Sequence, residues 1–509
     1  MSLLLRLSLA ALGGLALSAA FPDLGWWPLA FVALAALWLC LARASAWGGF
    51  LYGWVFGSAF MLPHVWWANV AVGLVPWLAL AIASGAFYGL FGAAWAHVRR
   101  SGMIRGGVWL EAPAFALLWA GMEQLRSIVP FGGFPWGRLA FSQLDVPVAS
   151  MAWLGGAALV SFVAACAGGL LGGGIEALLR KRLVTGIAAP LLGVVALSVG
   201  MLLPLSAQPI SGTLRLGIVQ GNVPNEGLDA FAQAREVTTN HRDGSLALVE
   251  DDPGPIDLLV WPENSSDYDP RTDPESAALV TQSAQAADAP LLLGTNDYSP
   301  EDGRYNMSLL WAPSGTVLDT YAKQRPAPFA EYIPIRDFAR RFSPEVDRVT
   351  HDVLPGDDPA VMTLPVPALE RTVTIGTVIC FEVAYDPIVT GAVSTGAEVL
   401  IVQTNNASFG ETAESTQQLA MSRLRAIETG RSTVQASTVG VSAVIDARGR
   451  VSQQTGLFTA EQMYAEVALR DTITPAVRLR LLWEWAPLIG AAGLAIAAVS
   501  RRLSNRYEW

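Results

Sequence analysis

Charged residues are scarce in this chain. Of its 509 residues, 15% are charged and 52% are hydrophobic, whereas soluble domains contain about 25% charged residues. The mean hydropathy of +0.39 agrees with this imbalance. A wholly soluble protein is therefore excluded, and we expect several segments to lie in a membrane.

Cysteine and histidine are scarce as well. The three cysteines are Cys40, Cys166 and Cys380, and the first two fall in apolar segments, so no disulfide framework is visible. The four histidines are scattered and lack the spacing of metal ligands. We therefore expect no metal and no cofactor, and Cys380 is left as the candidate reactive thiol.

The few charges divide the chain into three parts. Residues 1–204 hold 10 basic and 5 acidic residues, whereas residues 205–470 hold 18 basic and 35 acidic residues. We predict an N-terminal transmembrane domain (1–204), an acidic α/β domain (205–470) and a C-terminal transmembrane helix with a tail (471–509). The acidic balance argues against nucleic acid as a partner and against electrostatic docking on anionic lipid. Contact with the lipid bilayer is therefore expected through apolar loops.

Eight apolar segments approach the 20 or so residues that a membrane-spanning helix needs. Basic residues gather in alternate loops, which predicts cytoplasmic termini and an acidic domain on the outer face. The first segment is interpreted as an uncleaved helix because a second follows immediately. Glu111 lies within a span and is either functional or solvated near the cytoplasmic end. The predicted spans are residues 4–20, 25–42, 47–66, 71–96, 107–124, 148–175, 183–204 and 483–500.

One predicted outer loop combines a carboxylate, arginines and aromatic residues. Glu123 and Arg126 precede the run Phe134-Pro135-Trp136. The combination is typical of a lipid-headgroup site or substrate mouth. An interfacial aromatic belt with arginines reaching toward water would have the same composition, so both interpretations stay open.

The acidic domain alternates apolar strands with helices, which predicts a layered α/β fold. Many of the strands are rich in Val, Ile and Leu, as buried strands are. Strands are predicted at residues 213–220, 256–261, 291–294, 306–312, 316–321, 373–380, 399–402, 433–445 and 463–468, and helices at 229–250, 274–287, 384–395 and 414–430.

Three polar residues follow predicted strands: Glu263, Lys323 and Cys380. Opening an ester or amide requires a thiolate, a base that generates it and a positive group for the oxyanion. Glu263 could be the base, Lys323 the stabilising cation and Cys380 the nucleophile. Taken singly, each is more often a core or surface residue; the combination predicts a catalytic site.

Four motifs carry a resemblance to known proteins. They are Trp261-Pro262-Glu263-Asn264, Tyr321-Ala322-Lys323, Pro328-Phe329-Ala330-Glu331-Tyr332-Ile333-Pro334 and Cys380-Phe381-Glu382. These motifs resemble the Glu-Lys-Cys triad of the nitrilase superfamily. With the apolar segments, nearly the whole chain resembles the apolipoprotein N-acyltransferases, which are membrane-embedded members of that superfamily.

The resemblance implies a polytopic helical membrane domain joined to an αββα sandwich, in the bacterial cytoplasmic membrane. It implies that Cys380 takes a fatty acyl chain from a phospholipid as a thioester and passes it to the amine of a diacylated apolipoprotein. Glu263 would be the base and Lys323 would stabilise the tetrahedral intermediates. Glu331 and Glu382 would support the site. A monomer is expected.

The loops around residues 325–350, which include Phe329 and Tyr332, would form an apolar rim for the lipid. Two other functions remain open: a membrane-tethered amidase that uses water as acceptor, and a non-catalytic lipid-binding scaffold or transporter. Eight spans exceed what a tether needs, and the complete triad argues against a scaffold.

Several positions depart from the family pattern. This leaves the preferences for acceptor and lipid chain open, although the triad is intact. The departures are Ala330, Ser408, Gln435 and Thr438.

Overall fold

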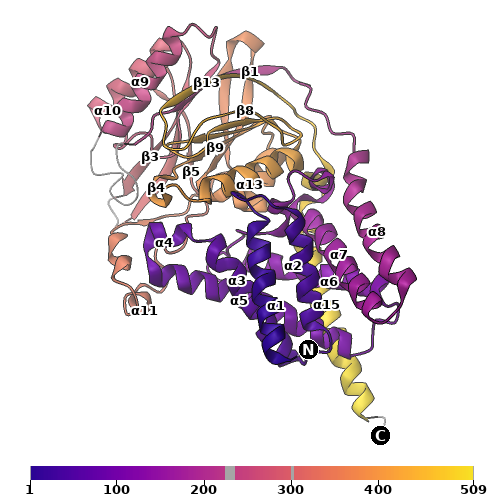
Figure 1. Ribbon diagram of the computed structural model, residues 1–509. Helices are drawn as coiled ribbons and strands as arrows, with labels where there is room; N and C mark the ends of the chain where they lie inside the picture. Colours follow the sequence, from indigo (N-terminus) through magenta and orange to yellow (C-terminus); the bar gives the residue numbers. More distant parts are fainter. Residues whose placement is uncertain (1, 224–234, 300–302, 508–509) are drawn as a thin grey trace. The chain divides into compact units, whose positions relative to one another are not determined.

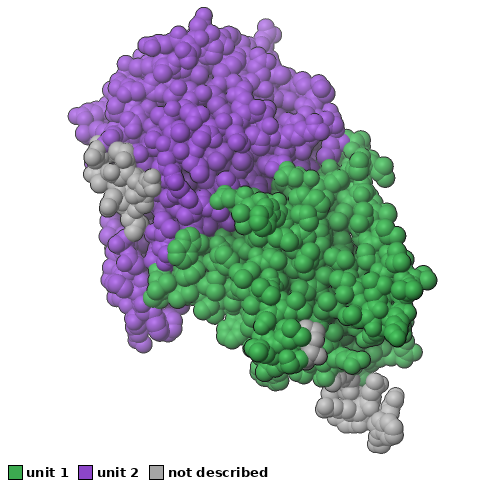
Figure 2. Space-filling view, in the orientation of Figure 1, with its two compact units in different colours: residues 1–66, 74–204, 479–509 green, residues 67–73, 205–478 purple. Residues whose placement is uncertain are grey.

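The computed structural model describes residues 2–223, 235–299 and 303–507 and divides into two compact units. Figure 2 colours unit 1, residues 1–66, 74–204 and 479–509, and unit 2, residues 67–73 and 205–478. Residues 67–73 lie between two segments of unit 1 in the sequence but belong to unit 2. They comprise the short helix α4 (Trp67–Val72) and one further residue. The predicted N-terminal domain, residues 1–204, includes this segment, whereas the structure groups it with unit 2.

Unit 1 is built from apolar helices, and a helix occupies each of the eight predicted span positions (Figure 1). Within the described residues, four helical segments are long and apolar enough to cross a membrane: 74–100, 147–179, 183–202 and 480–501. Eight spans therefore stay a prediction. The helices are α1 (Leu3–Ala19), α2 (Pro28–Leu41), α3 (Ala46–His64), α5 (Leu74–Arg100), α6 (Val108–Arg126), α7 (Ala152–Leu179), α8 (Leu183–Ser198) and α15 (Arg480–Tyr507).

Glycines allow α3 and α5 to approach closely. A Cβ atom on Gly49 would lie 2.3 Å from the carbonyl oxygen of Gly92, and one on Gly53 would lie 2.1 Å from that of Tyr88. Lipid tails are as apolar as the helices, so close van der Waals packing between small residues replaces the hydrophobic effect as the force that joins them. Any larger side chain at Gly49 or Gly53 would push the two helices apart.

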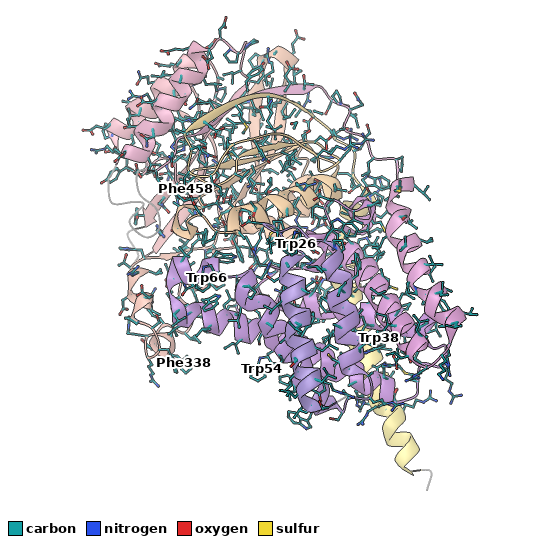
Figure 3. The ribbon with its side chains drawn as sticks, in the orientation of Figure 1. Trp26, Trp38, Trp54, Trp66, Phe338 and Phe458 are labelled. Carbon is teal, nitrogen blue, oxygen red and sulfur yellow. The ribbon has the colours of Figure 1, made fainter. Side chains whose placement is uncertain are left out.

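Glu111 has a structural role in unit 1. Arg99 Nη2 lies 3.1 Å from Glu111 and 3.1 Å from Glu176, and Trp38, labelled in Figure 3, donates its indole N–H to Glu176 at 2.9 Å. An acid that is paired and partly exposed does not need a catalytic explanation. Of the two interpretations left open, the structure favours a partly solvated acid near a helix end, because Glu111 lies in the first turn of α6 and its side chain is 20% exposed.

Unit 2 is an αββα sandwich, as expected. One sheet has the strand order β13-β1-β2-β3-β4-β5, with β6 paired to β4, and the other has the order β12-β11-β10-β9-β8-β7. Helices α9 (Glu236–Glu250) and α10 (Pro274–Ala286) cover the first sheet, and α13 (Glu414–Thr429) covers the second (Figure 1). Helix α12 (Asp386–Ser394) packs on the second sheet as well.

Continuous apolar or small residues bury the central strands β2, β9, β10 and β11 on both faces, whereas β12 is largely exposed. The strands are β1 (Thr213–Gln220), β2 (Leu258–Val260), β3 (Leu291–Ser299), β4 (Gly303–Trp311), β5 (Val317–Ala322), β6 (Asp352–Val353), β7 (Val361–Val366), β8 (Arg371–Ile379), β9 (Val399–Thr404), β10 (Thr433–Ser437), β11 (Ala443–Ile445), β12 (Val451–Gln454) and β13 (Glu461–Ala468).

The strand prediction for this unit needs correction. The single strand expected at 433–445 is a hairpin, because β10 and β11 pair antiparallel and residues 438–442 connect them. An apolar run cannot reveal that its chain turns back. Strands β6, β7 and β12 were not predicted. The helix expected at 229–250 begins at Glu236 in the described residues, and residues 229–234 lie outside them.

The two sheets also meet through buried polar contacts. Ser308 on β4 donates to Gln403 on β9 at 2.5 Å, and Gln403 donates to the carbonyl of Trp261 at 2.7 Å. These contacts hold the two sheets in one position relative to each other, because sliding them would leave the buried Gln403 amide without partners, at a cost in folding free energy. Trp261 follows β2, and β9 pairs with β8, so these contacts lie close to the strand ends that precede Glu263 and Cys380.

Candidate active site

Cys380 occupies a sharp turn at the carboxyl end of β8. Its φ is +51°, in the left-handed region, and it is the first residue of a 3₁₀ turn over Cys380–Ala384. Arg425 on α13 is fully buried and donates to the carbonyls of Val383 and Ala384, both at 2.8 Å. A strained nucleophile turn of this kind persists only when its surroundings hold it.

The other two predicted catalytic residues lie together in the same unit. Lys323 follows β5 and is 1% exposed, and Glu263 follows β2 and is 4% exposed. The Lys323 Nζ atom lies 3.3 Å from Glu263 Oε1 and 2.9 Å from Glu331 Oε1. The predicted residues Glu263, Lys323 and Glu331 are therefore one buried ionic cluster.

The cluster sets the charge state of its members. Burial alone would lower the pKa of Lys323, but the charges of Glu263 and Glu331, with Cys380, raise it above its ordinary value. Burial would raise the pKa of Glu331, but Lys323 and its hydrogen bonds hold it below the ordinary value. Burial raises the pKa of the Cys380 thiol, Glu263 raises it further and Lys323 lowers it. At rest the site therefore holds a thiol beside an ammonium group.

Two asparagines that the sequence did not single out hold the carboxylate of Glu263, the predicted base. Asn306 on β4 donates to Glu263 Oε1 at 2.7 Å and to Glu331 Oε1 at 3.1 Å. The backbone N–H of Asn405 donates to Glu263 Oε2 at 2.8 Å. Both carboxylate oxygens of Glu263 are thus fixed. Nothing in the local sequence around Asn306 distinguishes it from other polar residues of a hairpin.

Glu382 connects the turn that carries Cys380 to the loop after Lys323. It is fully buried, and it accepts from the Tyr321 hydroxyl at 2.9 Å, from the N–H of Gln324 at 2.7 Å and from the N–H of Ile379 at 2.9 Å. Burial raises the pKa of Glu382, and the Ile379 and Tyr321 hydrogen bonds, with Lys323, act in the opposite direction. Glu382 accepts every hydrogen bond named here, and the donors come from both sides of the turn. Its carboxylate therefore holds the turn in place.

Glu331 also anchors the apolar loop that follows Lys323. Its second oxygen accepts from the N–H of Ala327 at 2.6 Å, and Phe329 donates its N–H to the carbonyl of Tyr332 at 2.7 Å. Phe329 is 38% exposed, and Phe338 on α11 (Arg336–Ala339), labelled in Figure 3, is 56% exposed. We call the exposed apolar side chains of this loop the apolar rim: Phe329, Ile335, Phe338 and Phe342.

The predicted mouth residues of unit 1 are mostly buried. Glu123, Arg126 and Trp136 are each 1% exposed, and Pro135 is buried. Arg126 donates to the carbonyls of Phe134 and Trp136 at 2.8 and 2.5 Å. The interpretation of Arg126 as a side chain reaching toward water is wrong, because backbone carbonyls hold it inside. A role of these residues in substrate entry stays a prediction.

Glu123 fastens the same loop. Its Oε1 atom accepts from the indole N–H of Trp119 at 2.8 Å and from the N–H of Leu139 at 2.7 Å. A buried carboxylate that binds a backbone N–H sixteen residues away fixes the path of the chain between them.

Two of the family departures are buried and have structural partners. Gln435 accepts from Ser422 at 2.7 Å and donates to the carbonyl of Val441 at 2.8 Å. Thr438 donates to the carbonyl of Glu263 at 3.3 Å. Ala330 is exposed. In residues 2–223, 235–299 and 303–507, no group of three or more His, Cys, Asp or Glu side chains is arranged to hold a metal ion.

Comparison with known proteins assigns both parts of the chain. Residues 13–170 match the family model of the apolipoprotein N-acyltransferase N-terminal domain, and residues 216–474 match that of carbon-nitrogen hydrolases. The chain is 38% identical to the apolipoprotein N-acyltransferase of Mycolicibacterium smegmatis, over 98% of this chain and 86% of that protein. It is 30% identical to the enzyme of the same name from Azotobacter vinelandii, over 94% and 92%. A solved mutant of the Nesterenkonia AN1 amidase from the nitrilase superfamily is 18% identical, with a TM-score of 0.39, over 55% of this chain and 100% of that one.

Proposed function

This chain belongs to the apolipoprotein N-acyltransferase family, and from that membership and the site geometry we propose its reaction in full. It transfers a fatty acyl chain from a membrane phospholipid, through a thioester on Cys380, to the N-terminal amine of the diacylglyceryl-cysteine of apolipoproteins. The observation that carries the proposal is the buried Lys323 ammonium, held between Glu263 and Glu331 at 3.3 and 2.9 Å in a site whose thiol, on Cys380, directly follows β8.

In the first half-reaction, Glu263 takes the proton of the Cys380 thiol, and the thiolate attacks the ester carbonyl of the phospholipid. Lys323 stabilises the negative charge that develops on the carbonyl oxygen. The C–S bond forms, the ester C–O bond breaks, and the proton on Glu263 passes to the oxygen of the departing lysophospholipid.

In the second half-reaction, the acceptor amine attacks the thioester carbonyl. Glu263 takes the proton that the nitrogen loses as the C–N bond forms. The C–S bond breaks, and Glu263 returns the proton to the Cys380 thiolate. The same base and the same cation serve both steps, because both pass through a tetrahedral oxyanion. Glu331 and Glu382 support the site by holding Lys323 and the nucleophile turn.

We propose that both termini are cytoplasmic and that the catalytic domain lies on the outer face of the bacterial cytoplasmic membrane. The distribution of basic residues supports this orientation. The boundaries at 204 and 470, eight spans and a monomeric state belong to the same proposal. The rim would meet the lipid, since exposed phenylalanines favour an apolar phase.

The rim can be tested with a matched control. Phe338→Ser and Phe342→Ser should lower turnover of phospholipid in vesicles while the thermal midpoint of unfolding stays unchanged, because both side chains are exposed. Leu318→Ser removes a 42% exposed apolar side chain from β5, outside the loop, and should leave turnover unchanged. Equal turnover in all three variants and the wild type would refute the role of the rim.

Intact-protein mass spectrometry tests the reaction itself. After incubation with phospholipid, the wild type should gain one fatty acyl mass, Cys380→Ala should gain none, and a diacylated lipopeptide should discharge the adduct. An adduct that water discharges at the same rate would favour a hydrolase. A folded protein that gains no mass and releases no lysophospholipid would overturn the proposal in favour of a scaffold.

A further inference from the structure

The carboxyl end of β9 brings a threonine beside the nucleophile. Strands β8 and β9 are parallel, and Ile379 pairs with Gln403. The residues that follow, Cys380 and Thr404, therefore lie next to each other at the same edge of the sheet. Burial raises the pKa of the Cys380 thiol, and a hydrogen bond with the fully buried Thr404 side chain acts against it.

We propose that Thr404 is a further catalytic residue, whose hydroxyl donates a hydrogen bond to the Cys380 thiolate in both half-reactions. The inference rests on the proposed function, because it assigns Cys380 as the nucleophile. Lys323 supplies the positive charge of the site, but it is already bound to Glu263 and Glu331. A neutral donor stabilises a thiolate without adding a charge that must be buried.

The Thr404 hydroxyl has a second hydrogen-bond partner, which allows it to bond the sulfur both as a thiol and as a thiolate. Thr404 Oγ1 donates to Gln418 Oε1 at 2.8 Å, and the Asn406 amide donates to the same oxygen at 3.0 Å. In the thiol state, Thr404 donates to Gln418 and accepts from the S–H group. In the thiolate state, its single proton turns to the sulfur, and Gln418 Oε1 keeps the Asn406 donor. Neither state leaves a buried acceptor without a donor.

A buried acid fixes Asn406 in turn. The Asn406 amide donates to Glu414 Oε2 at 2.5 Å, and its oxygen accepts from Ser437 at 2.6 Å. Burial raises the pKa of Glu414 to about 8, with the charge of Glu263 acting in the same direction and the Asn406 hydrogen bond against it. Near neutral pH, Glu414 is therefore mostly protonated and adds little negative charge beside the thiolate. Glu414 is a positioning residue that acts through Asn406.

The proton balance of the reaction is unchanged by this assignment. Glu263 still takes the thiol proton, and the Thr404 hydroxyl keeps its own proton throughout. Its hydrogen bond strengthens when the sulfur becomes negative, during attack on the phospholipid and again when the thiolate leaves the tetrahedral intermediate. Removal of the hydroxyl should therefore slow both half-reactions.

The test compares Thr404→Val, which removes the hydroxyl at nearly constant volume, with Thr404→Ser, which keeps it. In the full-length protein in detergent, the alkylation rate of the Cys380 peptide by iodoacetamide is followed against pH by mass spectrometry. We expect the valine variant to shift the alkylation midpoint upward by about one pH unit, a tenfold effect on thiolate formation. Release of lysophospholipid should fall by about tenfold, and the serine variant should match the wild type.

Thr377→Val is the matched control, because Thr377 is also fully buried on β8 and its hydroxyl bonds Ser308 at 3.4 Å, away from the thiol. Its alkylation profile should equal that of the wild type. Thr404→Ala replaces the valine variant if that protein fails to fold, as judged by thermal unfolding.

Two results would overturn the inference: a wild-type alkylation profile in the folded variant without the hydroxyl, or a serine variant as slow as the valine variant. Failure of the proposed function gives a different result. The wild type would then release no lysophospholipid, while the alkylation profiles would still report on Thr404.

Discussion

Glu382→Gln should loosen the turn that carries the nucleophile. The carboxylate is fully buried and accepts from the Tyr321 hydroxyl and from the backbone N–H groups of Gln324, Arg325 and Ile379, at 2.7 to 3.1 Å. Glutamine has nearly the same shape, but it replaces one acceptor oxygen with an NH₂ group. In either orientation of the amide, at least one buried donor then faces another donor.

The magnitude follows from these contacts. Leaving the Ile379 N–H unpaired costs about 2 kcal/mol. The donors that remain lose a charged acceptor, which weakens each of their hydrogen bonds by roughly 1 kcal/mol. We therefore expect the variant to be less stable by about 5 kcal/mol, which for a domain of this size lowers the unfolding midpoint by on the order of 10 °C.

The assay combines thermal unfolding with the rate of acyl-adduct formation on Cys380. The variant should show a lower midpoint and, at a temperature where it is folded, an adduct rate at least tenfold below the wild type. Glu398→Gln is the control, because Glu398 binds Arg371 at the opposite end of β8 at 2.7 Å. That variant should be less stable but acylate normally. A destabilised Glu382→Gln that acylates at the wild-type rate would refute the positioning role, and an unchanged midpoint would refute the energetic reasoning.

Three further predictions concern the charges of the site. Lys323→Met leaves the carboxylates of Glu263 and Glu331 buried without their cation, so stability should fall by about 3–5 kcal/mol and no adduct should form; an adduct in mass spectra would contradict the assignment. Asn306→Leu removes two hydrogen bonds to the same carboxylates and should slow adduct formation by about 10²-fold, whereas Asn306→Ser should have an intermediate rate. A rate of adduct formation in Asn306→Leu equal to that of the wild type would refute the role of Asn306. Glu414 keeps its proton in the folded state up to about pH 8 but loses it near pH 4.5 when unfolded, so wild-type stability falls as pH rises through that window. Glu414→Gln should remove this decline, which reaches about 1.4 kcal/mol per pH unit. The same pH dependence of the unfolding free energy in the variant and the wild type from pH 5 to 8 would contradict the prediction.

Patterns local in sequence predicted much of the fold. Apolar runs located the helices of unit 1 and most strands of unit 2, because burial on one or both faces leaves a periodic record. The run at 433–445 was misassigned, since β10 and β11 are both apolar and the turn between them carries no strong signal. Similarly, α4 is a separate helix that groups with unit 2, and composition does not distinguish it from the span that follows.

The sequence by itself determined the membrane character and the α/β class, and it predicts the three residues of the triad, because each depends on residue type and on position relative to a strand. Only the tertiary structure decided which groups surround them. Asn306 and Thr404 resemble other polar strand residues until β4 lies beside Glu263 and β9 lies beside Cys380. Likewise, Arg126 is held inside by the carbonyls of Phe134 and Trp136, a contact that composition does not encode. The physical reason is that a buried polar group is stabilised by whatever donor or acceptor the packing of distant segments brings within 3 Å, and sequence spacing carries no record of that partner.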